Sequence, residues 1–423
     1  MHLLLDMLIA GDRRLIFAYL FLCIFSLALL WSVTEPIRGP YEDLDPGVPK
    51  SIFFRQVIWV VVGCLVMVAT ARLSLHYLAN IAWLLYLLVI VLLVLVLAVG
   101  PPVGGARRWL VLGPLRMQPS EMAKIAFILV SAGILSRNQG EHRQFVPTLT
   151  TFVLMAVLFV LVLKEPDLGS ALVFPAIWLG MIFWYGTSGV FLLGVGTAVL
   201  SAVISFYSET VSENPLPWGI YLVILIGFLY LSRFRVLASG IILLGNIAAG
   251  IGIPYFWVRL QTYQQERIMA FFEPTRDASG SGYQVIQSKV AIGSGGLFGT
   301  HYLQGTQKGL AFLPERHTDF IFSVVGEELG FAGAIALLVL FLVIILRGLD
   351  LAQTSRRPFS AFLAIGIATY FAFHVVVNVA ITTGLLPVTG LPLPLISYGG
   401  SNLLTTSFLV GLLVNVSSRQ YES

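Results

Sequence analysis

The sequence has few charged residues and few cysteines. Only 11% of its 423 residues are charged and 57% are hydrophobic, with a mean hydropathy of +0.90, far from the composition of soluble domains. Cys23 and Cys64 both lie in apolar runs, which predicts small core side chains and argues against a disulfide framework or zinc site. Its weak net charge of +4 argues against a nucleic-acid partner.

Long apolar runs dominate the remaining sequence. Several approach the roughly 20 residues that a helix needs to cross a bilayer core. They are continuous rather than alternating, which favours helices over an outer-membrane barrel. Because no small-residue cleavage site follows Arg13 and Arg14, the first run is predicted to be an anchor rather than a cleaved signal peptide. The predicted fold is an all-α, polytopic integral membrane helical bundle, with residues 1–423 forming a single transmembrane domain.

A hydropathy window predicts about twelve membrane helices. Their approximate ranges are 15–33, 56–71, 78–99, 120–136, 147–163, 169–186, 189–207, 216–232, 236–255, 318–346, 359–386 and 395–416. Residues 285–292 are apolar around Lys289 and suggest a further half-helix or re-entrant piece. Pro387, Pro392 and Pro394 should break the helical pattern before the last helix.

Basic residues in the short loops set the predicted orientation. The positive-inside rule places both termini in the cytoplasm and leaves 256–317 as the largest extracytoplasmic loop. Three arginines, Arg107, Arg108 and Arg116, then lie outside against the rule. Binding of an anion would explain why they are there.

Four polar groups lie at the predicted outer face, where ionisable residues are costly and indicate function. The first contains Arg108, Trp109, Glu121 and Lys124, the second Glu165 and Asp167, the third Arg267, Asp277 and Gln284, and the fourth Glu315, His317 and Asp319. Lys289 and Ser397 lie close to them in the predicted topology. The shared location of these groups is a stronger signal than any single residue.

Several of these residues also have a purely structural interpretation. Glu121 could favour a helix start and pair with Lys124 at i,i+3 spacing, and Trp109 could be an interface aromatic. Asp167 after Pro166 looks like a helix N-cap. Thr318 and Asp319 could cap the helix that follows, leaving His317 as a hydrogen-bonded spacer.

Asp277 is the strongest candidate for catalysis. It lies in the middle of a loop, beside a Gly- and Ser-rich turn, so an Asx-turn is the structural alternative. The functional interpretation is a general base in a basic pocket, which takes a proton from an attacking sugar hydroxyl. Positioned proton transfer of this kind contributes roughly 10²–10⁴ in rate.

These motifs resemble the SEDS family (shape, elongation, division and sporulation proteins), and its rod-shape branch most closely. The similar strings are 105–110 with 118–124, 165–171, 277–284 into 287–296, 305–307, 313–322, 326–330 and 391–401. They cover about three-quarters of the chain in the expected order. Arg316 matches the elongation branch, whereas Ala278 departs from the proline usual after the aspartate and leaves the shape of that turn open.

The resemblance implies a peptidoglycan glycosyltransferase that polymerises lipid II into glycan strands with inversion, for cell elongation. It places the essential acid on Asp277; Arg108, Lys124 and Arg267 or Lys289 would bind the pyrophosphate, and Glu121 would orient Lys124. No ligand cluster in the sequence demands a metal cofactor, although a divalent cation could assist at the pyrophosphate. The implied partners are a class B penicillin-binding protein and the elongation machinery, in the bacterial inner membrane.

Three points stay open from the sequence. A lipid II flippase also needs a polar cavity, although it would place its charges nearer the membrane midplane. A non-catalytic scaffold for the penicillin-binding protein is the other alternative, but it leaves Arg108, Lys124 and Asp277 unexplained. Family members typically have ten helices, so the sequence predicts an additional helix pair within 189–232.

Overall fold

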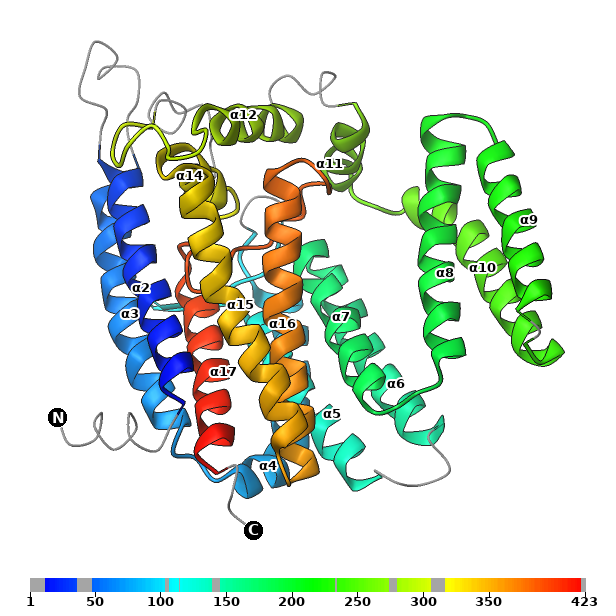
Figure 1. Ribbon diagram of the computed structural model, residues 1–423, viewed down its shortest axis with the longest axis horizontal. Coiled ribbons are helices and arrows are strands. Elements are labelled where there is room, and N and C mark those ends of the chain that lie inside the picture. Colours follow the sequence, from blue (N-terminus) through cyan, green and yellow to red (C-terminus); the bar gives the residue numbers. More distant parts are fainter. Residues whose placement is uncertain are drawn as a thin grey trace. The chain divides into compact units, whose positions relative to one another are not determined.

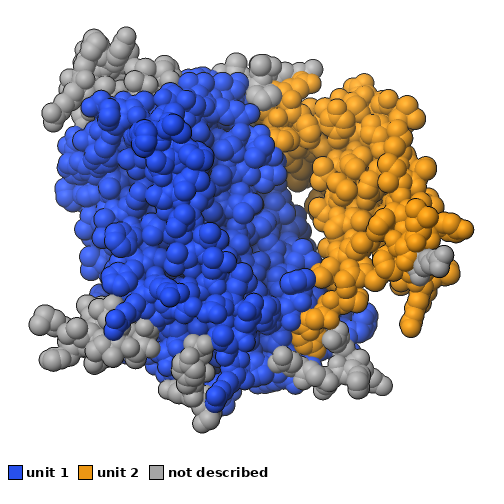
Figure 2. All heavy atoms as spheres, in the orientation of Figure 1, with its two compact units in different colours: residues 1–184, 274–423 blue, residues 185–273 orange. Residues whose placement is uncertain are grey.

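The computed structural model describes residues 12–35, 48–102, 106–113, 115–138, 145–232, 234–273, 280–305 and 316–419. The chain divides into two compact units, coloured differently in Figure 2. Unit 1 consists of residues 1–184 and 274–423, and unit 2 of residues 185–273.

Unit 1 is a helical bundle with one short hairpin. Its helices are α2 (Arg13–Thr34), α3 (Lys50–Thr70), α4 (Leu75–Val99), α5 (Pro119–Arg137), α6 (Phe145–Lys164), α7 (Leu168–Trp184), α12 (Ser281–Ser294), α14 (Ile321–Glu328), α15 (Gly330–Thr354), α16 (Pro358–Thr382) and α17 (Gly400–Ser418). Strands β1 (Leu110–Leu112) and β2 (Leu115–Met117) pair antiparallel just before α5. Figure 1 shows the long helices running side by side, with α12 lying across their ends.

Unit 2 is built from α8 (Gly189–Phe206), the π-helix η2 (Tyr207–Val211), α9 (Leu216–Leu231), α10 (Val236–Trp257) and α11 (Thr262–Phe272). A polar seam holds α8, α9 and α10 together inside apolar surroundings. The buried Asn246 amide donates to the Thr197 hydroxyl at 3.1 Å and accepts from the Tyr221 hydroxyl at 2.9 Å. Such hydrogen bonds favour helix association where the alternative is lipid.

The predicted membrane bundle is confirmed. Each of the twelve predicted segments contains a helix, and within the described residues ten helices are long and apolar enough to cross a membrane. The apolar helices α7 and α9 are shorter, with 17 and 16 residues. The helices α8 and α9 occupy the region of the additional pair, whose status as an insertion stays a prediction.

The prediction of one helix over 318–346 is wrong, because the chain breaks between α14 and α15. Gly330 has φ +66°, and a Cβ on it would lie 2.3 Å from the Gly299 amide nitrogen. The prediction that Thr318 and Asp319 cap this helix is also wrong. The N-cap of α14 is Phe320, and no side chain caps it.

The predicted proline break before the last helix is confirmed. The helix α16 ends at Thr382 and α17 begins at Gly400, with irregular backbone between Gly384 and Gly399. This connection is buried at Leu391 and Leu393. Irregular backbone of this kind is tolerated at membrane depth only where protein or water satisfies its polar groups.

Candidate active site

A buried ion pair lies in the first turns of α5, where Pro119 starts the helix. The Lys124 ammonium is 2.5 Å from a carboxylate oxygen of Glu121, and both side chains are almost completely buried. The i,i+3 spacing places both side chains on one helix face. Because an unpaired buried charge would strongly destabilise the fold, each of the two side chains needs the other as its partner.

Helices α16 and α17 complete the surroundings of this pair. Asn402 at the start of α17 donates to the second Glu121 oxygen at 3.4 Å. The Lys124 ammonium lies 5.7 Å from the centre of the Tyr370 ring, within the range of a cation–π contact. Tyr370 in turn packs on His374, whose ring nitrogen Nδ1 is 3.2 Å from the Pro392 carbonyl. The pair is thus held by three helices and by the connection between α16 and α17.

Asp167 joins the start of α7 to the start of α5. One carboxylate oxygen accepts from the Ser170 amide at 3.1 Å, which confirms the structural interpretation of Asp167 as a helix N-cap. The other oxygen accepts from the Gln118 side chain at 3.2 Å. Asp167 therefore caps α7. Through Gln118, it is also linked to the start of the helix that carries Glu121.

Glu165 is the most unusual carboxyl group of the site. Its side chain is fully buried, and neither carboxyl oxygen has a hydrogen-bond partner among the described residues. Burial, with a smaller contribution from Asp167, raises the pKa of Glu165 to about 9, although Arg108 opposes the shift. The group is therefore neutral at pH 7.

Arg108 fastens the segment before β1 to the turn between α6 and α7. Its guanidinium donates to the backbone carbonyls of Glu165, at 3.3 Å, and of Pro166. Trp109 follows it directly and is half-buried. The arginine predicted to bind an anion thus lies beside the second predicted polar group.

The predicted residues His317, Asp319 and Ser397 meet in a second cluster of backbone contacts. The Ser397 hydroxyl donates to the Thr318 carbonyl at 2.7 Å, and the Tyr398 amide donates to the His317 carbonyl at 2.9 Å. The buried Asn378 side chain donates to the carbonyls of Asp319, at 2.9 Å, and Leu391, at 2.8 Å. The turn at 316–320 is therefore fixed to the connection that also contains Pro392.

The helix α12 carries two further predicted residues, Gln284 and Lys289. The buried Ser288 hydroxyl lies 2.6 Å from both the Ser323 hydroxyl on α14 and the Thr382 carbonyl on α16. Lys289 is exposed, and its ammonium lies over Gly384, 2.5 Å from where a Cβ would be. These contacts therefore fix α12 against α14 and against the end of α16, the helix that also carries Tyr370.

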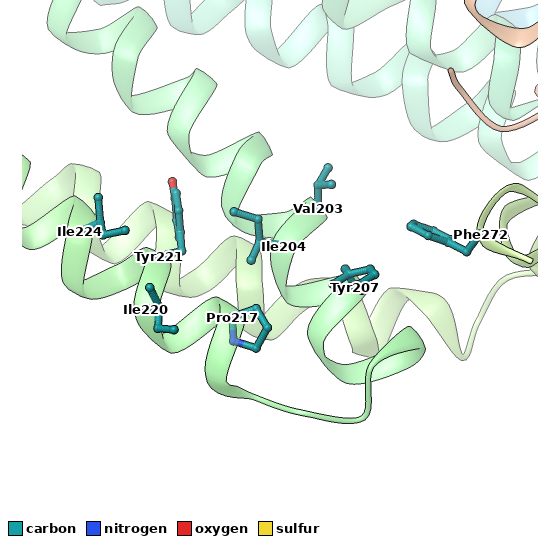
Figure 3. Close-up of a pocket in the computed structure, with 8 residues that line it drawn as sticks. All are labelled: Val203, Ile204, Tyr207, Pro217, Ile220, Tyr221, Ile224 and Phe272. Atoms are coloured by element: carbon teal, nitrogen blue, oxygen red, sulfur yellow. The ribbon is translucent and has the colours of Figure 1, made fainter. Parts of the chain in front are cut away.

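Three predicted site residues are not among the described residues of unit 1. Arg267 belongs to α11 in unit 2. Asp277 and Glu315 lie outside the described residues. Unit 2 has a pocket of about 570 Å³, but its lining is apolar and includes none of the predicted site residues, as Figure 3 shows. No charged side chain among the described residues lines it.

Sequence reasoning missed several residues that build the site. Asn378, Asn402 and His374 are buried polar side chains within α16 and α17. A polar residue inside a predicted membrane helix was the signal that could have identified them. Glu328, the last residue of α14, is a further buried carboxylate and accepts from the Ser32 hydroxyl at 2.6 Å.

Comparison with known proteins gives a consistent result. The family model FTSW_RODA_SPOVE, described as "Cell cycle protein", matches residues 13–214 and 217–422. A probable peptidoglycan glycosyltransferase FtsW from Trichlorobacter lovleyi is 37% identical over 96% of this chain and 93% of its own length. The peptidoglycan glycosyltransferase MrdB of Escherichia coli K12 is 33% identical over 97% of this chain and 94% of its own.

Solved structures agree with the sequence relatives. A chain from a peptidoglycan synthase complex that coordinates polymerization and crosslinking has a TM-score of 0.66 and 31% identity, covering 98% of this chain and 99% of that one. The rod shape determining protein RodA of Thermus thermophilus has a TM-score of 0.62 and 28% identity, covering 98% of each chain. This multi-pass membrane protein therefore belongs to the FTSW_RODA_SPOVE family, as the resemblance to SEDS proteins predicted.

Proposed function

We propose that the chain is a peptidoglycan glycosyltransferase that polymerises lipid II into glycan strands for cell elongation. The observation that carries this proposal is the connected polar site in unit 1. There Arg108, Glu165, Asp167 and the Glu121–Lys124 pair are linked through α5, α7 and the segment before β1. Relatives that are named peptidoglycan glycosyltransferases cover almost the whole chain, which supports the same activity.

The depth of the ion pair supports a polymerase over a flippase. Lys124 is the sixth residue of α5, so its Cα lies about 8 Å along the helix from Pro119. That is near the end of the helix rather than at its middle. A carrier would need its charges near the membrane midplane, whereas a polymerase acts where the sugars and the pyrophosphate reach water.

The proposed reaction needs one base and several cations. Asp277 removes the proton from the acceptor sugar hydroxyl, and that oxygen attacks the anomeric carbon of the donor. The bond from this carbon to the pyrophosphate oxygen breaks with inversion, and the lipid pyrophosphate leaves with its negative charge. Arg108 and Lys124 stabilise this charge, together with Arg267 or Lys289. Glu121 orients Lys124 through their ion pair.

Polymerisation of purified lipid II tests the role of Asp277. We expect Asp277→Asn to lose roughly 10²–10⁴ of the rate, because the amide cannot accept the proton. Glu266→Gln, an exposed position on α11, is the matched control and should polymerise normally. A folded Asp277→Asn protein with the wild-type rate would contradict the proposal.

Lys124 requires a test that separates its structural role from its role in catalysis. Lys124→Met should destabilise the protein by about 3–5 kcal/mol, because Glu121 is left buried without its partner. The double variant Glu121→Gln with Lys124→Met removes both charges, so it should recover most of the stability and still fail to polymerise lipid II. If the double variant polymerised at the wild-type rate, Lys124 would not bind the pyrophosphate.

Cellular context is part of the same proposal. We propose that both termini are cytoplasmic, that the protein is in the bacterial inner membrane, and that a class B penicillin-binding protein is its partner. The positive-inside pattern supports the orientation. A relative of known structure belongs to a complex that coordinates polymerization and crosslinking, which supports the partner.

A further inference from the structure

A cleft separates α4 and α5 at the ends where α4 begins and α5 ends. It has a volume of about 180 Å³, and it is lined by Ala79, Ala82, Trp83, Val130, Gly133, Ile134, Arg137 and Asn138. The two helices are otherwise closely packed along their length. The small residues Ala79, Ala82 and Gly133 leave room for the cleft. Arg137, the only charged residue of its lining, lies at one end.

The chemistry of the cleft changes along its length. Arg137 is exposed in the last turn of α5, and its guanidinium has no ion-pair or hydrogen-bond partner among the described residues. The neighbouring Asn138 side chain caps the helix by donating to the Ile134 carbonyl at 2.7 Å. Deeper in the cleft the lining is apolar, up to Trp83, whose ring packs edge-on against Tyr86.

Gly133 keeps the cleft open. A Cβ at this position would meet no atom within 4 Å, so the space beside it is not filled by protein. Glycine lowers helix stability by about 1 kcal/mol relative to alanine, and no close contact to the backbone requires it here. An occupant that is not part of the chain would account for this empty space.

We propose that the cleft binds one anionic phospholipid, with its phosphate on Arg137 and part of an acyl chain beside Gly133. A cation at a helix end with an apolar groove leading from it matches the amphipathic structure of a lipid. Basic pockets between membrane helices commonly bind anionic headgroups. Charge complementarity favours a lipid over a second protein helix, since a helix would leave Arg137 without an anion.

This site is distinct from the Glu121–Lys124 pair, because it lies at the opposite end of α5. The assignment holds in either orientation of the chain, since both leaflets contain phospholipid. Binding at this position would stabilise the packing of α4 on α5 and hence the helix that carries Lys124.

Native mass spectrometry of the full chain, released from nanodiscs of equal phosphatidylglycerol and phosphatidylcholine, tests the proposal. We expect wild type to retain one phosphatidylglycerol in preference to phosphatidylcholine. Arg137→Gln should lower the affinity about fivefold, the effect of one basic residue near a lipid headgroup. Gly133→Leu should fill the space beside α5, where a Cβ would meet no atom within 4 Å, and so exclude the acyl chain and lose the lipid.

Two matched variants serve as controls. Arg356→Gln removes an exposed arginine from the loop between α15 and α16, and Gly245→Leu fills an equally open glycine position on α10. Both should retain the lipid as wild type does. Equal retention of the two lipids by wild type would overturn the proposal, as would identical losses in Arg137→Gln and Arg356→Gln. A dimer that Gly133→Leu dissociates would mean that a second copy fills the cleft instead.

Discussion

Glu165 combines three features that rarely occur in one carboxyl group. It is fully buried, its oxygens have no hydrogen-bond partner among the described residues, and it lies near both a carboxylate and a guanidinium. Burial outweighs the attraction of Arg108, so the neutral acid is the stable form. In the folded protein the Glu165 carboxyl group therefore keeps a proton that it would release at neutral pH in the unfolded chain.

The stability of the protein should consequently fall as the pH rises from about 4.5 to about 9. In this window the folded state binds one proton more than the unfolded state, and each pH unit lowers the free energy of unfolding by at most about 1.4 kcal/mol. Glu165→Gln, which copies the neutral form, should remove this component of the pH dependence and be more stable than wild type at pH 8. Thermal unfolding in detergent from pH 5 to pH 9 measures both effects. Parallel pH profiles for the two proteins would show that Glu165 is ionised in the folded state.

Individual residues of the site could be predicted only in part from the sequence. The pairing of Glu121 with Lys124 followed from their i,i+3 spacing, and the capping role of Asp167 followed from Pro166 before it. Contacts across the bundle could not be predicted in this way. Asn402 reaches Glu121 over a separation of 281 residues, which no local pattern encodes.

The helices α12 and α14 meet at one of the closest backbone contacts in unit 1. A Cβ on Gly295 would lie 1.9 Å from the Gly326 carbonyl oxygen, so this contact requires glycine. The Phe331 amide also donates to the Gly296 carbonyl at 2.9 Å, which ties the start of α15 to the same turn. The position of α12 against α14 depends on this junction.

Gly295→Ala should therefore separate α12 from α14. We expect a loss of about 1–3 kcal/mol, typical of an overpacked contact, and faster hydrogen–deuterium exchange over 281–305. Gly293→Ala, two residues earlier and within α12, is the matched control, because its Cβ would meet no atom within 4 Å and alanine favours a helix. Similar exchange in the two variants would contradict the importance of the close contact.

The positions of the helices were largely predictable because lipid demands long apolar runs. Proline also marked the irregular connection before α17 correctly. The break at Gly330 was not predicted, because the hydropathy of 318–346 is compatible with one continuous helix. What breaks it is the left-handed conformation of Gly330 against Gly299, and hydropathy carries no information about that contact.

The chain as a whole consists of two units, each with polar contacts of its own. In unit 2, Asn246 joins α8, α9 and α10 through Thr197 and Tyr221. In unit 1, the buried Asn415 of α17 donates to the carbonyls of Thr70, at 2.9 Å, and Leu73, at 2.7 Å, at the end of α3. Each asparagine satisfies polar groups of its own unit, where water is scarce.

Replacing these asparagines should loosen one unit at a time. Asn246→Leu should cost about 0.6–1.7 kcal/mol for each hydrogen bond lost between membrane helices and should speed exchange in α8 and α10, leaving α3 and α17 unchanged. Asn415→Leu should show the reverse pattern, so each variant is the control for the other. Hydrogen–deuterium exchange of both proteins in the same detergent measures this directly. If either variant accelerated exchange throughout the chain, opening would be global, and the division into two compact units would not describe how the protein unfolds.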